Sequence, residues 1–207
     1  MMGKDYFKYY KPSVIIPFVL VLGTLLSLLV SFLITLLIDN TSKHYYQFPS
    51  TTILIGGLIY LIDKFLWKYK PFIWLYWKRD ISGRYEGVIE FNNYQDGSRE
   101  DRLIAIEIQQ TGSVIKLHTY FNNKNADTSK SESKLISLSK DEFNNLSIFM
   151  NYHNKGNSIL NIPEHFGTNV LEYHNGQLEG YYYTNKSPQT KGAMKAKYIS
   201  NKLKKSF

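Results

Sequence analysis

The chain has 207 residues, no cysteine and a formal net charge of +8. The lack of cysteine excludes disulfides, thiolate metal sites and cysteine nucleophiles. The positive charge is concentrated in one part of the chain, because residues 1–79 carry nine basic and three acidic residues, whereas residues 80–207 carry 16 and 14. We therefore do not expect a polymeric nucleic acid as a partner.

The first predicted element is an apolar helix over residues 13–38, which contains no charged residue. At about 1.5 Å per residue this segment is long enough to cross a hydrocarbon core of roughly 30 Å. It is also about twice the length of the apolar core of a signal peptide. The sequence therefore predicts a retained membrane helix, with the lipid bilayer as a partner.

A second apolar segment, residues 50–67, carries Asp63 and Lys64 near its end. Two interpretations remain open: a second membrane span, which we favour, or an amphipathic helix lying on the membrane surface. With two spans, residues 1–79 form a two-helix transmembrane anchor. The loop 39–49 has a single lysine, whereas lysines and one arginine flank both segments on their other sides, so the positive-inside bias places both chain ends in the cytoplasm.

Small residues recur at every fourth position along the first helix, at Gly23, Ser27, Ser31 and Thr35. Such a stripe allows close helix–helix approach and hydrogen bonding in lipid. It is compatible with packing against the second helix of the same chain or with association between protomers.

From residue 81 onward the apolar pattern changes to the period of two that is typical of strands. Ile104, Ile106 and Ile108, for example, share one face. The eight predicted strands cover residues 84–91, 103–110, 114–121, 129–138, 146–152, 168–174, 177–184 and 190–199. This all-β domain, residues 80–201, is expected to close as an eight-stranded antiparallel up-and-down β-barrel, followed by a basic tail at 202–207.

The predicted connections give the barrel a direction. Short turns near residues 111–113, 139–143 and 175–176 alternate with longer polar loops at 92–102, 122–126, 153–167 and 185–189. Since the strands run up and down, the longer loops gather at one end, where we expect a binding site. Ser131, Ser133, Thr119, Thr184 and Thr190 are expected to make part of the interior polar.

The chemistry at this mouth favours binding over catalysis. The five histidines have no metal-ligand spacing, and there is no nucleophile elbow or phosphate-cradling glycine loop, so we expect no metal, no cofactor and no enzymatic activity. Lysines there can meet phosphates, amides and hydroxyls can contact base edges, and aromatic rings can stack on bases. These residues are Lys186, Lys191, Asn154, Asn185, Thr168, Thr184, Thr190, Tyr152, Tyr183, His165 and Phe166.

The sequence also resembles a known family, the two-transmembrane β-barrel effectors of CBASS anti-phage signalling. The resemblance rests on two apolar segments followed by ISGRYEG at 81–87, YHN at 152–154, HFGT at 165–168, LEGYYYT at 178–184 and TKG at 190–192. It implies ligand contacts at Tyr152, Asn154, His165, Gly167, Thr168, Thr184, Lys186 and Thr190.

The resemblance further implies an effector of the bacterial inner membrane that binds a cyclic dinucleotide, forms a homo-oligomer and disrupts the membrane, killing the cell. The 153–167 loop would be a candidate lid. Two other functions stay open at this stage: a tethered lipocalin-like barrel for a small apolar molecule, and a membrane-bound enzyme. The identity of the bases, the oligomer size and the mode of membrane damage do not follow from the sequence.

Overall fold

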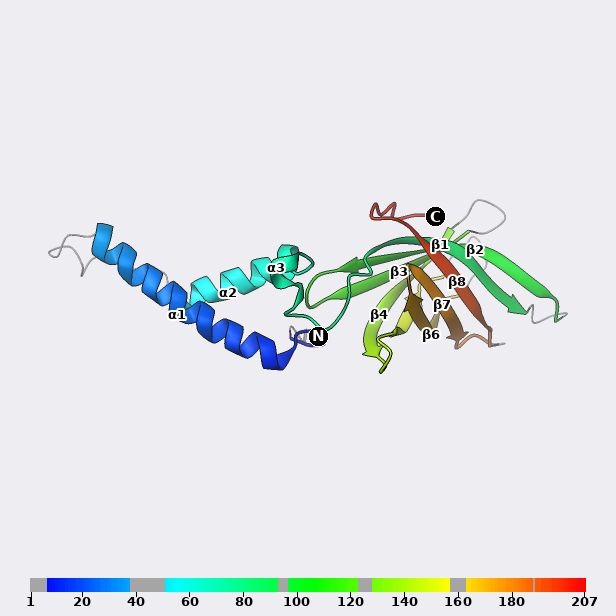
Figure 1. The fold of residues 1–207 in the computed structure, drawn as a ribbon. Coiled ribbons are helices and arrows are strands. Elements are labelled where there is room, and N and C mark those ends of the chain that lie inside the picture. The colour runs from blue at the N-terminus through cyan, green and yellow to red at the C-terminus, as the bar shows by residue number, and fades with distance from the viewer. Residues whose placement is uncertain (1–6, 38–50, 93–96, 123–127, 157–162, 188) are drawn as a thin grey trace. The chain divides into compact units, whose positions relative to one another are not determined.

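The fold is known from a computed structural model of the full chain (Figure 1). It describes residues 7–37, 51–92, 97–122, 128–156, 163–187 and 189–207. The chain divides into two compact units. The first contains residues 1–80 together with 111–114, and the second contains residues 81–110 and 115–207.

The first unit is helical. Its elements are α1 (Pro12–Leu37), α2 (Thr51–Leu61), the π-helical turn η2 (Ile62–Leu66) and α3 (Lys70–Ile73). Helices predicted over 13–38 and 50–67 are thus confirmed, except that the end of the second one is a π-helical turn. The predicted loop 39–49 lies outside the described residues.

Within the part of the chain that the structure describes, α1 is the one helix long and apolar enough to cross a membrane. Its leucines at 20, 28 and 36 are 63–67% exposed, as expected of side chains that face lipid. Membrane association of α1 fits these features. Because α2 has only 11 residues, a second span remains a prediction.

The stripe of small residues on α1 is divided between two environments. A Cβ on Gly23 would lie 3.2 Å from Cδ1 of Ile55, so this glycine packs against α2 of the same chain. Ser27, Ser31 and Thr35 are exposed, and Thr35 Oγ1 donates to the Ser31 carbonyl oxygen at 3.0 Å. Gly23 therefore packs within the chain, while association between protomers remains a prediction for the other three positions.

A polar cluster around Asp63 completes the first unit. Its Oδ1 accepts hydrogen bonds from the hydroxyls of Tyr10 (3.1 Å) and Ser113 (2.6 Å). The Asp63 carbonyl accepts from the Gly112 amide at 2.7 Å. Lys78, buried between Tyr9 and Trp67, donates to the Thr111 carbonyl oxygen at 2.6 Å. These bonds fix residues 111–113, the turn between two barrel strands, within the helical unit.

The second unit is a closed β-barrel in which every strand pairs antiparallel with its neighbours in sequence, and β8 returns to β1 (Figure 1). The strands are β1 (Gly83–Asn92), β2 (Arg99–Gln110), β3 (Ile115–Asn122), β4 (Thr128–Lys140), β5 (Leu146–Asn154), β6 (His165–His174), β7 (Gln177–Thr184) and β8 (Lys191–Ser200). The predicted up-and-down architecture is confirmed, and closure leaves no free sheet edge.

The connections alternate in length as predicted, except that those between β3 and β4 and between β4 and β5 both have five residues. The turn between β6 and β7 has Asn175 and Gly176 at φ 47° and 81°, the left-handed conformation that two-residue hairpins require. The predicted 153–167 loop was too long at both ends, because His153 and Asn154 continue β5 and β6 already begins at His165. The middle of that loop, 157–162, lies outside the described residues, so its role as a lid stays a prediction.

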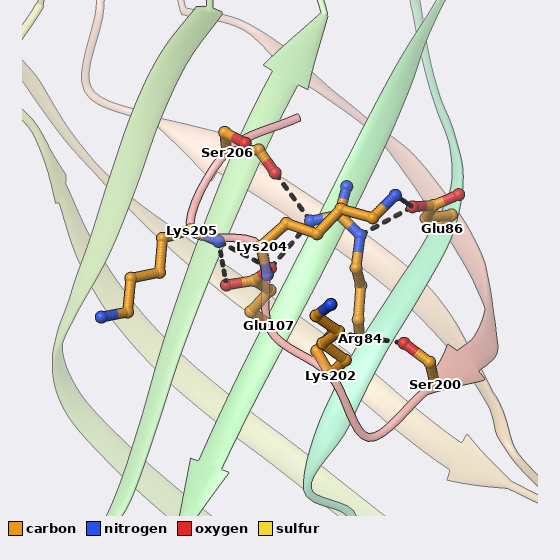
Figure 2. Close-up of polar contacts among 8 residues, drawn as sticks. All are labelled: Arg84, Glu86, Glu107, Ser200, Lys202, Lys204, Lys205 and Ser206. Atoms are coloured by element: carbon orange, nitrogen blue, oxygen red, sulfur yellow. Dashed lines mark hydrogen bonds and ion pairs between the residues drawn. The ribbon is translucent and has the colours of Figure 1, made fainter.

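The C-terminal tail packs on the outside of the barrel (Figure 2). Arg84 of β1 and Glu107 of β2 form a buried ion pair there, with Nη1 and Oε1 2.8 Å apart. The tail covers this pair: the amides of Lys204 and Lys205 donate to the Glu107 carboxylate at 2.7 and 3.1 Å, and Arg84 donates to the Ser206 carbonyl oxygen at 2.6 Å. The basic tail thus contacts the barrel mainly through its backbone.

Candidate ligand-binding site

Strand alternation divides the barrel interior into an apolar end and a polar end. Toward the short turns the inward positions are aliphatic and fully buried, as in Leu117, Leu171 and Leu178. Toward the longer loops the same strands present Thr119, Asn169 and other polar side chains. The apolar half fills the barrel, so a ligand can enter only the polar half.

That polar half encloses a cavity of about 190 Å³. The lining side chains come from all eight strands and from the β7–β8 connection. They are Ile89, Phe91, Arg102, Thr119, Phe121, Ser131, Tyr152, Asn154, His165, Asn169, Tyr182, Thr184, Lys186, Thr190 and Met194.

Hydroxyl and amide groups around the cavity are fixed by hydrogen bonds to one another. The hydroxyls of Thr184 and Thr190 are 2.8 Å apart, and the Thr190 amide donates to Thr184 Oγ1 at 3.1 Å. Asn154 Nδ2 donates to Ser131 Oγ at 3.1 Å. These pairs join the end of β7 to the residue that precedes β8 and join β4 to β5, and hold polar atoms in place for a ligand.

Aromatic rings provide flat surfaces in the same cavity. Tyr152 packs edge-on against His165 with ring centroids 6.3 Å apart, and its ring occupies the space where a side chain at 167 would lie. Burial raises the pKa of the Tyr152 hydroxyl and raises that of Tyr182 to about 12, so both phenols are neutral donors at pH 7.

Two cationic side chains line the cavity. Lys186 is half-buried, and its pKa is lowered, first by burial and then by the charge of Arg102. Arg102 places its guanidinium over the Phe91 ring, 5.0 Å from the centroid. Two positive side chains that line one cavity suit an anionic ligand, whose phosphates would stabilise both.

His165 is a neutral member of this group at pH 7. Burial is the main cause that lowers its pKa, and the charge of Lys186 adds to the effect. Its Nδ1 lies 3.0 Å from the Pro163 carbonyl oxygen, which can only accept, so Nδ1 carries the proton and Nε2 is the acceptor. Among the described residues, no group of three or more histidine, cysteine or carboxylate residues is arranged to hold a metal ion.

The structure gathers most of the residues that the sequence singled out. Six of the eight ligand positions line the cavity: Tyr152, Asn154, His165, Thr184, Lys186 and Thr190. Gly167 lies behind the Tyr152 ring, which fills its inward face. Thr168 is on the outer face, where its hydroxyl donates to Asn151 Oδ1 at 2.9 Å, so the structure does not bring it into the cavity.

The other mouth residues have different positions. Tyr183, Phe166 and Lys191 are exposed on the outer surface. Asn185 joins the β7–β8 connection to β6, because its Oδ1 accepts from the Phe166 amide at 2.8 Å.

Sequence reasoning missed Arg102 and Asn169 as lining residues. Side chains of a strand alternate between its two faces, so Arg102 lies on the inward face with Ile104, and Asn169 lies on the inward face with Leu171. The predicted loop 92–102 includes Arg102, whereas β2 begins at Arg99, four residues before the predicted strand.

The fold and the cavity define a class: an eight-stranded barrel whose polar, cationic and aromatic-lined end receives a small ligand. The particular family follows from comparison with known proteins. Residues 79–198 match the family model described as Cap15, cyclic dinucleotide receptor domain. The chain therefore belongs to this family of receptor domains, a CBASS effector family. Curated proteins gave no match.

Proposed function

We propose that this protein is an effector of bacterial anti-phage immunity that binds a cyclic dinucleotide in the barrel, self-associates in response and disrupts the inner membrane, killing the infected cell. The observation that carries the proposal is the composition of the cavity. A cyclic dinucleotide has two flat bases and two phosphates, and one cavity offers rings, amides, hydroxyls and two cations. Family membership supports the same ligand.

Different lining residues would contact different parts of the ligand. Lys186 and Arg102 meet phosphate charge, the arginine with a planar fork that suits a phosphate. Tyr152 and Tyr182 offer ring faces and hydroxyl donors, while Asn154 and the Thr184–Thr190 pair offer further polar atoms. A catalytic role is not needed to account for these groups, and we infer a receptor without enzymatic activity.

The membrane half of the proposal rests on α1. Its exposed apolar surface suits lipid, and the exposed small residues Ser27, Ser31 and Thr35 suit close approach between helices of different protomers. A ligand drives assembly only if it binds the assembled form more tightly. Converting 1% assembled protein to 99% takes about 5.5 kcal/mol of differential affinity. Both chain ends and the barrel are then cytoplasmic.

The lipocalin-like alternative is less well supported. A carrier of an apolar molecule would have an aliphatic cavity, but here the aliphatic layer is packed solid, and nine of the fifteen residues that line the space above it are polar or charged.

The direct test is calorimetry on the full-length protein in detergent with a panel of cyclic dinucleotides. Reversing the charge with Lys186→Glu should weaken binding by about tenfold or more, since hydrogen bonds to charged groups contribute about 1.5–3 kcal/mol. Lys140→Glu, the same change at the end of β4 near the short turns, should leave affinity unchanged. No heat with any cyclic dinucleotide or trinucleotide, or equal effects of both variants, would overturn the proposal.

A further inference from the structure

Two buried polar atoms in the cavity lack the partners that a folded protein normally supplies. Among the described residues, these are Oγ1 of Thr119 and Oδ1 of Asn169. Their residues are only 1% and 3% exposed, and both line the cavity. Unpaired buried polar atoms are rare and destabilise a fold, so they call for a function at the place where they occur.

Both atoms lie at the floor of the cavity. Thr119 on β3 and Asn169 on β6 are each one inward step above Leu117 and Leu171, which are fully buried in the apolar layer. A group that reaches the floor therefore meets these two side chains last.

The size of the cavity indicates what reaches the floor. Its volume of about 190 Å³ is below the roughly 300 Å³ at which pockets for whole drug-sized ligands begin. A cyclic dinucleotide can thus place only one part at the floor. That part is a base, because Lys186 and Arg102 would hold the phosphates nearer the longer loops, and a base needs hydrogen-bond partners when it leaves water.

On the basis of the proposed function, we propose that Asn169 and Thr119 read the edge of one base of the cyclic dinucleotide and that this base is adenine. A carboxamide carries an acceptor and a donor side by side, which match the N6 amine and N7 of adenine. The Thr119 hydroxyl can donate and accept, and adds a second contact. When the base presents this same edge, a carbonyl oxygen in place of the amine puts a second acceptor opposite Asn169 Oδ1, and such unmatched buried groups give strong discrimination.

The test compares two ligands that differ at that group and at the adjacent N1, which becomes a donor when a carbonyl replaces the amine. Cyclic di-adenosine monophosphate and its inosine counterpart, in which a carbonyl replaces each N6 amine, are titrated into the full-length protein in detergent. The adenine ligand should bind at least about tenfold more tightly, equivalent to about 1.4 kcal/mol.

Variants assign this preference to the cavity floor. Asn169→Leu should bring the two ligands to equal affinity, and Thr119→Val should weaken the adenine ligand severalfold. The same substitutions on the outer face, Asn151→Leu and Thr168→Val, serve as matched controls and should preserve the preference. Since Oδ1 of Asn169 and Oγ1 of Thr119 make no hydrogen bond to another described residue, neither floor variant should lower the thermal unfolding midpoint.

Three outcomes would overturn the inference and leave the proposed function standing: equal affinity for the two ligands in the wild type, tighter binding of the inosine ligand, or an unchanged preference in Asn169→Leu. A protein that binds no cyclic dinucleotide would overturn both. A marked loss of thermal stability in both floor variants would make these residues structural and would also contradict the inference.

Discussion

At the scale of single residues, the cavity combines two basic side chains, Lys186 and Arg102, with a histidine that is neutral at pH 7. Burial lowers the pKa of His165 below the ordinary value of about 6.5. Because this histidine is neutral at pH 7 and can be protonated at lower pH, the affinity for an anionic ligand should depend on pH.

Ligand affinity should rise as the pH falls from 7 to 5. Bound phosphates stabilise the protonated histidine and raise its pKa, so binding takes up a proton. A rise of one pKa unit on binding corresponds to up to about a tenfold gain in affinity. Calorimetry across this range should show the gain in the wild type and a flatter profile in His165→Gln. An equally steep profile in the variant would show that another group is responsible.

At the scale of elements, the outer face of β1 and β2 depends on the ion pair that the tail covers. Arg84 and Glu107 have side-chain exposures of 1% and 0%, so removal of one partner leaves a charge in a poorly solvated place. The two tail amides on Glu107 compensate part of that charge and tie the last residues of the chain to the barrel.

Arg84→Met should lower the free energy of unfolding by about 3–5 kcal/mol, the usual cost of breaking a buried pair. Lys195→Met, which breaks the exposed pair with Glu179, should cost about 1 kcal/mol or less. Chemical denaturation of the full chain followed by circular dichroism measures both. Equal, small losses of unfolding free energy in the two variants would mean that the buried Arg84–Glu107 pair contributes no more to stability than an exposed pair.

The exposed stripe on α1 gives a second prediction at this scale. Ser27→Leu with Ser31→Leu should reduce killing of cells without altering ligand affinity, because bulk on this face keeps helices apart. Leu29→Met with Leu33→Met, roughly 200° around the helix, serves as the control. Undiminished killing by the serine variant would restrict the role of the stripe to the packing of Gly23 within the chain.

Strand periodicity explains both what the sequence predicted and what it missed. Alternation identified all eight strands and their order, since each strand has one buried face. It could not locate strand ends in polar sequence, so Arg102 was assigned to a loop. The family resemblance implies ligand contacts at both Gly167 and Thr168, although neighbouring residues of a strand point to opposite faces. Once His165 begins β6, parity turns Asn169 inward and Thr168 outward.

At the scale of the whole molecule, one chain contains a receptor barrel and an apolar helix. The turn at 111–114 belongs to the helical unit although it connects β2 to β3, so the chain enters that unit again in the middle of the barrel sequence. The bonds from Asp63 and Lys78 hold this turn. Ligand binding can drive the assembly of protomers in the membrane only if the assembled form has a higher affinity for the ligand than the resting form.

The most direct measurement is dye release from liposomes of bacterial lipid that contain the full-length protein, with cyclic dinucleotide present on both sides of the bilayer. The account predicts release that depends on the ligand in the wild type, none in Lys186→Glu, and normal release in Lys140→Glu. Vesicles that stay sealed although calorimetry shows the ligand bound, or that leak equally without it, would contradict the account.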